Sequence, residues 1–393
     1  MIAFVNAFLI DGTGRAPVEG AVVLVEGKRI LSVGKDVPAG ADVYNLDGRT
    51  LMPGLTDAHI HFGGSDALDK EPLATVEKTD WYREMRESLI NFGVTNARSA
   101  GDFEHDMLRL KMLINTGEIT GPRIWVAGKC FQAAGGHPAY TVWQSNQSII
   151  DYVVTEPKTI EDAVHEVNRQ AHAGTDHIKC FLTDDNVLQP DQKSPKLNLE
   201  IFRAAIIHAH KNNLKAMVHC QEPLDAQTAL IAGADTIEHL MCKGHSGAPM
   251  PGGLADLFKR VGAFLVPTLC CDEFHGADTL AIEQKHQAVK QLYDAGVKLA
   301  VGTDAGTPFV PPGESVHIEM AAMVTAGVST METIIAATRY GAELVGSNEF
   351  GVIEAGKLAD IIVVDGNPIE DIMLSKKISI VMKEGTILKN TVS

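Results

Sequence analysis

The residues of this chain best suited to chemistry are two histidines, His59 and His61, at the end of an apolar run that begins at Leu51. Side chains on a β-strand alternate between its two faces, so residues two apart point the same way. A His-x-His pair on a strand therefore directs two imidazoles to one point, and neutral imidazole is the commonest metal ligand. Two histidines at this spacing also occur on surface loops. The pair predicts a metal site only if other ligands join it.

Four more polar residues lie at or near the ends of other apolar, strand-length segments. They are Lys179, His219, His239 and Asp304. Each one alone is more often a satisfied core group or a loop anchor than a ligand. Together, the four imidazoles and the carboxylate suit zinc or a similar divalent first-row ion.

The middle of the chain alternates between strand-length and helical segments. Strands are predicted at residues 51–58, 93–97, 123–127, 176–180, 215–219, 234–239, 263–267 and 298–302. Apolar residues with a 3.6-residue period predict helices between them, at residues 160–173, 199–212 and 223–232. Such alternation indicates an α/β fold with a parallel sheet, and eight units favour closure into a TIM-like (β/α)8 barrel. A doubly wound open sheet is the alternative, but no Gly-x-Gly-x-x-Gly turn supports it.

Both ends of the chain have a β-rich pattern that differs from the middle. Short β-branched runs lie at residues 21–25, 29–33, 360–365 and 378–382. We therefore expect a small β-sandwich domain formed by residues 1–52 and 350–393, and a barrel domain of residues 53–349. Because the chemistry of such barrels lies at the carboxyl ends of the strands, this fold would bring the candidate ligands together.

Charge and composition narrow the class of partner. The formal net charge of −16 argues against nucleic acid and against an anionic membrane surface. No apolar stretch approaches the ~20 residues of a membrane span, and the first residues do not resemble a signal peptide. Six cysteines without a Cys-x-x-Cys pair are typical of reduced thiols in a cytosolic protein. We expect a cytoplasmic protein that acts on a small molecule, and the sequence leaves homo-oligomer formation open.

Several of these motifs together resemble the amidohydrolase superfamily. They are residues 53–61, Lys179, His219, His239 and residues 302–304, with residues 351–361 and 367–368 similar to that superfamily's return to its β-domain. The resemblance covers nearly the whole chain, and it is closest to the imidazolonepropionase-like and Xaa-Pro dipeptidase-like branch. It implies a metal-dependent hydrolase of carbon–nitrogen bonds, built as a distorted barrel with a β-sandwich.

The resemblance also implies an arrangement of ligands. His59, His61 and Asp304 would bind one ion, and His219 and His239 would bind a second. Lys179 would react with carbon dioxide and bridge the two ions as a carbamate; a buried lysine paired with a carboxylate is the structural alternative. Two ions about 3.5–4 Å apart can hold a shared hydroxide and polarise a scissile carbonyl. Asp304 would then act as general base and general acid.

The same branch includes hydrolases of dipeptides and of N-acyl amino acids, and this class of substrate is implied here. The segment Gly135-Gly136-His137 is similar to one in which the histidine faces the substrate, so His137 is a second candidate catalytic residue, with a surface-loop position equally open. Arg98 is a candidate carboxylate binder or a brace of the barrel.

One residue points to a different function. Glu222 follows His219 at a spacing found in mononuclear deaminases and in imidazolonepropionase, where the glutamate protonates the substrate. A structural role in the first turn of a helix is the other interpretation, because an acid there complements the helix dipole. A mononuclear deaminase or cyclic-amide hydrolase that uses Glu222 is therefore the alternative to a two-metal amide hydrolase.

Overall fold

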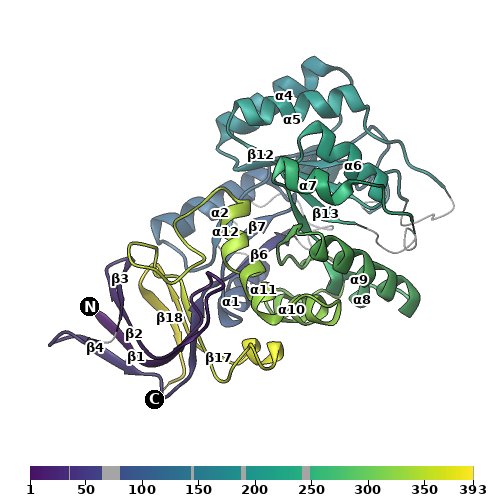
Figure 1. Cartoon of the computed structure of the whole chain (residues 1–393). Coiled ribbons are helices and arrows are strands. Elements are labelled where there is room, and N and C mark those ends of the chain that lie inside the picture. The colour runs from purple at the N-terminus through teal and green to yellow at the C-terminus, as the bar shows by residue number, and fades with distance from the viewer. Residues whose placement is uncertain (35, 64–79, 143–145, 187–191, 241–247, 393) are drawn as a thin grey trace.

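Strands and helices alternate through the middle of the chain, and strands from both ends form a separate sheet near the two termini (Figure 1). This computed structural model describes all residues except 35, 64–79, 143–145, 187–191, 241–247 and 393. The predicted α/β class with parallel sheets is confirmed.

An eight-stranded sheet joins the two ends of the chain. Its N-terminal strands are β1 (Ile2–Leu9), β2 (Val18–Glu26), β3 (Arg29–Gly34), β4 (Asp42–Asn45) and β5 (Thr50–Pro53). Its C-terminal strands are β16 (Ile361–Val364), β17 (Ile378–Lys383) and β18 (Thr386–Asn390). The order is β18-β17-β16-β5-β1-β2-β3, with β4 paired to β1. Met52 of β5 lies opposite Ile362 of β16, so the sheet depends on both ends of the chain.

Two parallel sheets contain the strands predicted for the middle of the chain. The smaller has the order β6 (Leu55–Ile60), β7 (Val94–Ser99) and β8 (Arg123–Trp125). The larger has the order β10 (Val154–Thr155), β9 (Cys130–Phe131), β11 (His177–Phe181), β12 (Lys215–Cys220), β13 (Thr236–His239), β14 (Phe264–Val266) and β15 (Lys298–Leu299). Each of the eight predicted segments contains a strand.

Backbone hydrogen bonds connect these two sheets at two places, beside β6 and β15 and beside β8 and β11. Next to β6 and β15, Ala58 N donates to Val301 O at 2.9 Å. Next to β8 and β11, Asp176 N donates to Val126 O at 2.9 Å. A barrel has no free sheet edge, and contacts of this kind are what its closure requires.

Helices pack around the parallel strands. They are α1 (Asp80–Asn91), α2 (Glu104–Thr116), α3 (Gln147–Val153), α4 (Ile160–Ala173), α5 (Leu199–Lys211), α6 (Pro223–Ala232), α7 (Leu254–Val261), α8 (Leu269–Phe274), α9 (Thr279–Asp294), α10 (Glu314–Thr325), α11 (Thr330–Ala336) and α12 (Arg339–Leu344), with a 3-10 turn, η3 (Ile372–Lys376). The three predicted helices are confirmed as α4, α5 and α6. A capping box of Thr159 and Asp162 starts α4. Over the described part of the chain, no helix is long and apolar enough to cross a membrane.

The apolar run that begins at Leu51 forms two strands, so the prediction of a single strand there is wrong. The chain leaves the terminal sheet at Pro53 and enters a parallel sheet at Leu55. A Cβ atom on the intervening Gly54 would lie 2.2 Å from Thr95 Oγ1, so glycine is needed where the chain changes sheets. Both strands are buried, and an apolar pattern alone does not reveal such a change.

The sequence predicts reduced thiols at the cysteines. Five of them are buried, and none of these five is disulfide-bonded: Cys130, Cys180, Cys220, Cys270 and Cys271. The sixth, Cys242, lies outside the described residues.

Candidate metal centre

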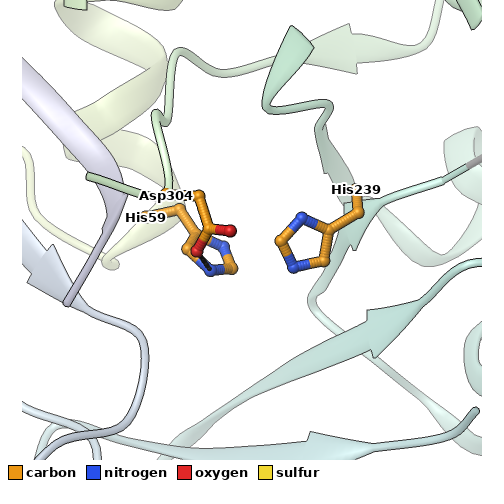
Figure 2. Close-up of side chains that lie close together, drawn as sticks. All are labelled: His59, His239 and Asp304. Atoms are coloured by element: carbon orange, nitrogen blue, oxygen red, sulfur yellow. Dashed lines mark ion pairs between the residues drawn. The ribbon is translucent and has the colours of Figure 1, made fainter. Parts of the chain in front are cut away.

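Three buried side chains converge from β6, from the end of β13 and from the segment after β15. His59, His239 and Asp304 each place a possible ligand atom within 4.8 Å of the others, and Figure 2 shows His239 facing His59 and Asp304. His59 Nε2 and Asp304 Oδ1 lie 3.2 Å apart, and neither atom has a hydrogen-bond partner among the described residues. Buried polar atoms are rarely left unpartnered. The donor set and its unpartnered atoms therefore fit a divalent cation.

The two histidines of the His-x-His pair both face the same carboxylate oxygen. His61 Nε2 lies 3.1 Å from Asp304 Oδ1, close to the distance of His59 Nε2 from that atom. On the other side of each ring, His59 Nδ1 lies 2.6 Å from Glu238 Oε2 and His61 Nδ1 lies 3.0 Å from Gly101 O. A neutral imidazole that donates from Nδ1 keeps a lone pair on Nε2, so both Nε2 atoms are available to one ion.

The segment that carries Asp304 is shaped by close contact with β6 and the residue that follows it. Asp304 has a left-handed backbone (φ +61°), and its N–H donates to His59 O at 2.8 Å. His61 N donates to Ala305 O at 2.7 Å. A Cβ atom on Gly306 would lie 1.8 Å from His61 O, so a larger residue would push the segment away. The Gly-Thr-Asp-Ala-Gly sequence thus allows the close approach that places the carboxylate between the two imidazoles.

Five imidazoles form a row across the candidate site. The distances between successive ring centroids are 5.5 Å for His61 and His59, 4.7 Å for His59 and His239, 4.4 Å for His239 and His219, and 5.0 Å for His219 and His137. The structure therefore brings all five predicted histidines into one site. His137, the candidate substrate contact, lies at the end of the row beyond His219.

Lys179 is buried on β11, and its Nζ has no hydrogen-bond partner in the described part of the chain. Its Nζ lies 5.1 Å from the ring centroid of Phe181. Burial lowers the pKa of Lys179 below its usual value. The structural alternative, a lysine held by a bonded carboxylate, is therefore not what the described residues show.

Burial and neighbouring charges set the protonation states of the candidate ligands. Burial lowers the pKa of His219 and of His239 well below the usual value, so both are neutral at pH 7. Burial alone would raise the pKa of Asp304, but the adjacent His59 and His61 imidazoles outweigh this and leave the pKa well below the usual value. These are the forms of His219, His239 and Asp304 that bind a metal ion, whereas against the opposing effect of burial the neighbouring Asp304 raises the pKa of His61.

His219 differs from the other members of the row in its bonding. Its Nε2 accepts a hydrogen bond from Gln221 Nε2 at 3.2 Å. This amide would have to turn away for His219 to bind an ion through Nε2.

A buried ion pair behind His59 was not predicted from the sequence. Glu238 accepts from His59 through Oε2 and from Arg98 Nη2 through Oε1, the latter at 2.7 Å. Arg98 also donates from Nε to Ala58 O at 2.7 Å, which makes it a brace between strands. Burial raises the pKa of Glu238, but Arg98 and His59 outweigh this and lower it. In the sequence, the signal that could have indicated this pair is Glu238 itself, an acidic residue in a short strand directly before the candidate ligand His239.

The other two sequence candidates differ in their surroundings. His137 Nδ1 lies 2.6 Å from Thr141 Oγ1, and burial lowers the pKa of His137 to about 4. Glu222 comes directly before α6, and its Oε1 lies 3.5 Å from Lys193 Nζ, in the loop that follows β11. Its side chain is about one-third exposed, at 32%.

Comparisons with known proteins agree over most of the chain. A model described as "Amidohydrolase family" matches residues 50–388. Ochratoxinase of Aspergillus niger is 26% identical over 425 residues, covering 97% of this chain and 85% of that protein. Imidazolonepropionase of Geobacillus kaustophilus is 25% identical over 395 residues, covering 88% and 84%. A crystal structure of a Xaa-Pro dipeptidase with methionine bound in its active site has a TM-score of 0.83 and 27% identity, covering 99% of this chain and 100% of that one.

Proposed function

The chain belongs to the amidohydrolase family and is a hydrolase that acts on carbon–nitrogen bonds; from this premise we propose that it is a metal-dependent hydrolase of amide or peptide bonds in small molecules. The observation that carries the proposal is the buried cluster of His59, His239 and Asp304, whose ligand atoms lie within 4.8 Å of one another. Two of its atoms, His59 Nε2 and Asp304 Oδ1, lack a hydrogen-bond partner in the described structure.

We also propose that residues 53–349 form a closed (β/α)8 barrel and that residues 1–52 and 350–393 form a β-sandwich domain. The hydrogen bonds from Ala58 to Val301 and from Asp176 to Val126 support closure on both sides. The pairing of β5 with β16 supports a composite terminal domain.

The donor set suits two divalent ions, with zinc as the first choice. We propose that His59, His61 and Asp304 hold one ion, and that His219 and His239 hold the other. Lys179 would supply the connecting ligand: its neutral amine would add to carbon dioxide and release a proton to water, and the oxygen atoms of the resulting carbamate can bind metal. The Nζ of Lys179 is buried and has no hydrogen-bond partner among the described residues, which supports this role. When bound, the ions would supply an activated water at neutral pH and polarise the substrate carbonyl.

The chain's own residues have distinct roles in this proposal. Asp304 is an ionised carboxylate that can accept a proton from the attacking water and deliver it to the leaving nitrogen. His137 is neutral at pH 7 and lies beside His219, so it can form a hydrogen bond with the substrate without adding charge. Glu238 and Arg98 hold His59 from behind.

The proposed substrate is a dipeptide or an N-acyl amino acid. The Xaa-Pro dipeptidase structure with bound methionine supports this class, because it matches 99% of this chain at 27% identity. Hydrolysis of a cyclic amide with Glu222 is the second candidate, and the similarity to imidazolonepropionase favours it. Arg98 is excluded from solvent and bonded to Glu238, so we assign it a structural role rather than a contact with the substrate.

Metal analysis and one substitution test the proposed centre. The protein should contain about two divalent ions per chain, and Lys179→Ala should lose metal and activity, with partial recovery on addition of short carboxylic acids. Lys111→Ala is the control, because Lys111 forms an ion pair with Asp176 away from the candidate ligands. One ion or none in the wild-type protein, or an active Lys179→Ala variant with full metal content, would contradict the two-metal proposal.

A substrate screen separates the two candidate reactions. Zinc- or manganese-loaded protein should hydrolyse dipeptides or N-acyl amino acids, and Glu222→Gln should leave this turnover nearly intact. A large loss of turnover in Glu222→Gln, together with activity on cyclic amides alone, would favour the second candidate.

A further inference from the structure

One short segment after β14 contacts two of the proposed metal ligands from behind. Thr268 Oγ1 lies 2.8 Å from His239 Nδ1. Three residues later, Cys271 Sγ donates to Asp304 Oδ2 at 3.2 Å. Both residues are buried. The strand β14 supplies none of the proposed ligands, yet the segment that follows it contacts one ligand of each proposed ion.

The backbone of Thr268 is unusual for its residue type. Its φ of +48° and ψ of +51° lie in the left-handed region, which β-branched residues rarely adopt. At this residue the chain leaves β14 and enters α8. A conformation of this kind persists only when the surrounding structure holds it, and it is found most often at functional sites.

Two buried ionisable residues on neighbouring helices hold the segment in place. Cys270 N donates to Glu319 Oε2 at 2.7 Å, and Glu319 lies fully buried on α10. Lys285 of α9 is buried as well, and its Nζ lies 2.5 Å from Asp272 Oδ2 and 3.5 Å from Thr268 O. The segment is therefore fixed on its outer side by α9 and α10, while its inner side contacts the ligands.

We propose that residues 268–271 position the metal ligands, with Thr268 orienting the His239 imidazole and Cys271 orienting the Asp304 carboxylate. Donation from His239 Nδ1 to the Thr268 hydroxyl leaves the lone pair on Nε2, which is the atom then able to bind an ion. The Cys271 thiol engages Asp304 Oδ2 and leaves Oδ1 facing His59 and His61. The inference rests on the proposed metal-dependent function, and it makes Thr268 and Cys271 positioning residues rather than ligands.

The first test removes the Thr268 hydroxyl while keeping the shape of the side chain. In Thr268→Val, zinc affinity measured by competition with a chromogenic chelator should fall about 10–100-fold, the usual effect of losing an outer partner of a ligand. Thr268→Ser keeps the hydroxyl and should restore the affinity. The control is Thr175→Val, which loses a buried hydroxyl bonded to Gln170 O just before β11, away from the candidate ligands. Its affinity for zinc should not change.

The outcomes separate this inference from the proposed function. A wild-type protein that binds no zinc would contradict the proposed function itself. A wild-type protein that binds zinc, with unchanged affinity in Thr268→Val, would refute the positioning role. If Thr268→Val does not fold, Thr268→Ala tests the same prediction without the added methyl group.

The second test addresses the carboxylate. Cys271→Ala should lower kcat with little change in KM, because Asp304 would keep its place but lose its fixed orientation, and Cys271→Ser should recover most of the loss. The urea unfolding midpoint of each metal-free variant is measured in parallel. A lowered midpoint with wild-type kcat and wild-type zinc affinity would show a purely structural role and overturn the proposal.

Discussion

Replacing Arg98 with methionine would leave the Glu238 carboxylate buried without its cationic partner. The structure predicts a large effect, because Arg98 donates to Glu238, to Ala58 O and to Thr236 Oγ1, and both charged side chains are almost completely excluded from solvent. Breaking a buried pair by removal of one partner costs about 3–5 kcal/mol. We therefore expect Arg98→Met to reduce the free energy of unfolding of the metal-free protein by about this amount.

The assay is urea unfolding of chelator-treated protein for both single variants and the double variant. Arg98→Met with Glu238→Leu should cost clearly less than the sum of the two single changes, because neither charge then remains unpaired. Lys290→Met is the control: its pair with Asp294 is exposed, so its loss should cost less than about 1 kcal/mol. An Arg98→Met variant as stable as the Lys290→Met control would refute the buried-pair reasoning. A double variant whose loss of stability equals the sum of the two single losses would refute it as well.

Three further predictions concern protonation, backbone space and metal removal. Burial lowers the pKa of His317 to about 4. As the pH falls, this histidine is therefore protonated in the unfolded chain before it is protonated in the folded protein. Its contribution to stability is complete above pH 6.5 and is lost as the pH falls towards 4, by up to about 3 kcal/mol. In urea titrations at a series of pH values, His317→Asn should flatten this loss, and an unchanged pH profile would show that His317 does not cause it. Gly306→Ala should lower both stability and zinc affinity, because its Cβ would lie 1.8 Å from His61 O; Gly356→Ala is the matched control, a left-handed glycine with no atom within 4 Å of the added Cβ, and equal zinc affinities in the two variants would contradict the close-contact argument. Zinc at 100 times its dissociation constant should stabilise the chelator-treated protein by about 2.7 kcal/mol, and an unfolding midpoint that does not respond to zinc would count against a metal held in the fold.

Local patterns predicted the elements of the fold well. The 3.6-residue period around α4 and the apolar strand at β12 are properties of the segment itself, and the polar residues that interrupt buried strands, such as His219 and His239, stand out for the same reason. The capping box of Thr159 and Asp162 also depends only on residues that are close together in the sequence.

The sequence could not predict features that depend on contacts between distant segments. The change of sheet at Gly54 depends on Thr95, which lies on another strand. The roles of Glu238 and Thr268 depend on which histidine nitrogen each one contacts on another strand, and no spacing along the chain encodes that distance. From the sequence alone Arg98 could be a carboxylate binder or a brace, because the residues next to it do not reveal its burial.

The pairing of β5 with β16 has a consequence for how the chain folds during synthesis. Met52 pairs with Ile362, so β5 has no partner on that side until almost the entire chain has left the ribosome. Only Gly54 separates β5 from β6, which carries His59. Contacts between residues so far apart in sequence form slowly. Until β5 pairs with β16, its unpaired edge is prone to aggregation. During synthesis, we therefore expect folding of the terminal sheet to begin only after residues 361–364 have been made. In refolding of the complete chain, we expect the pairing of β5 with residues 361–364 to be slower than assembly of the histidine row.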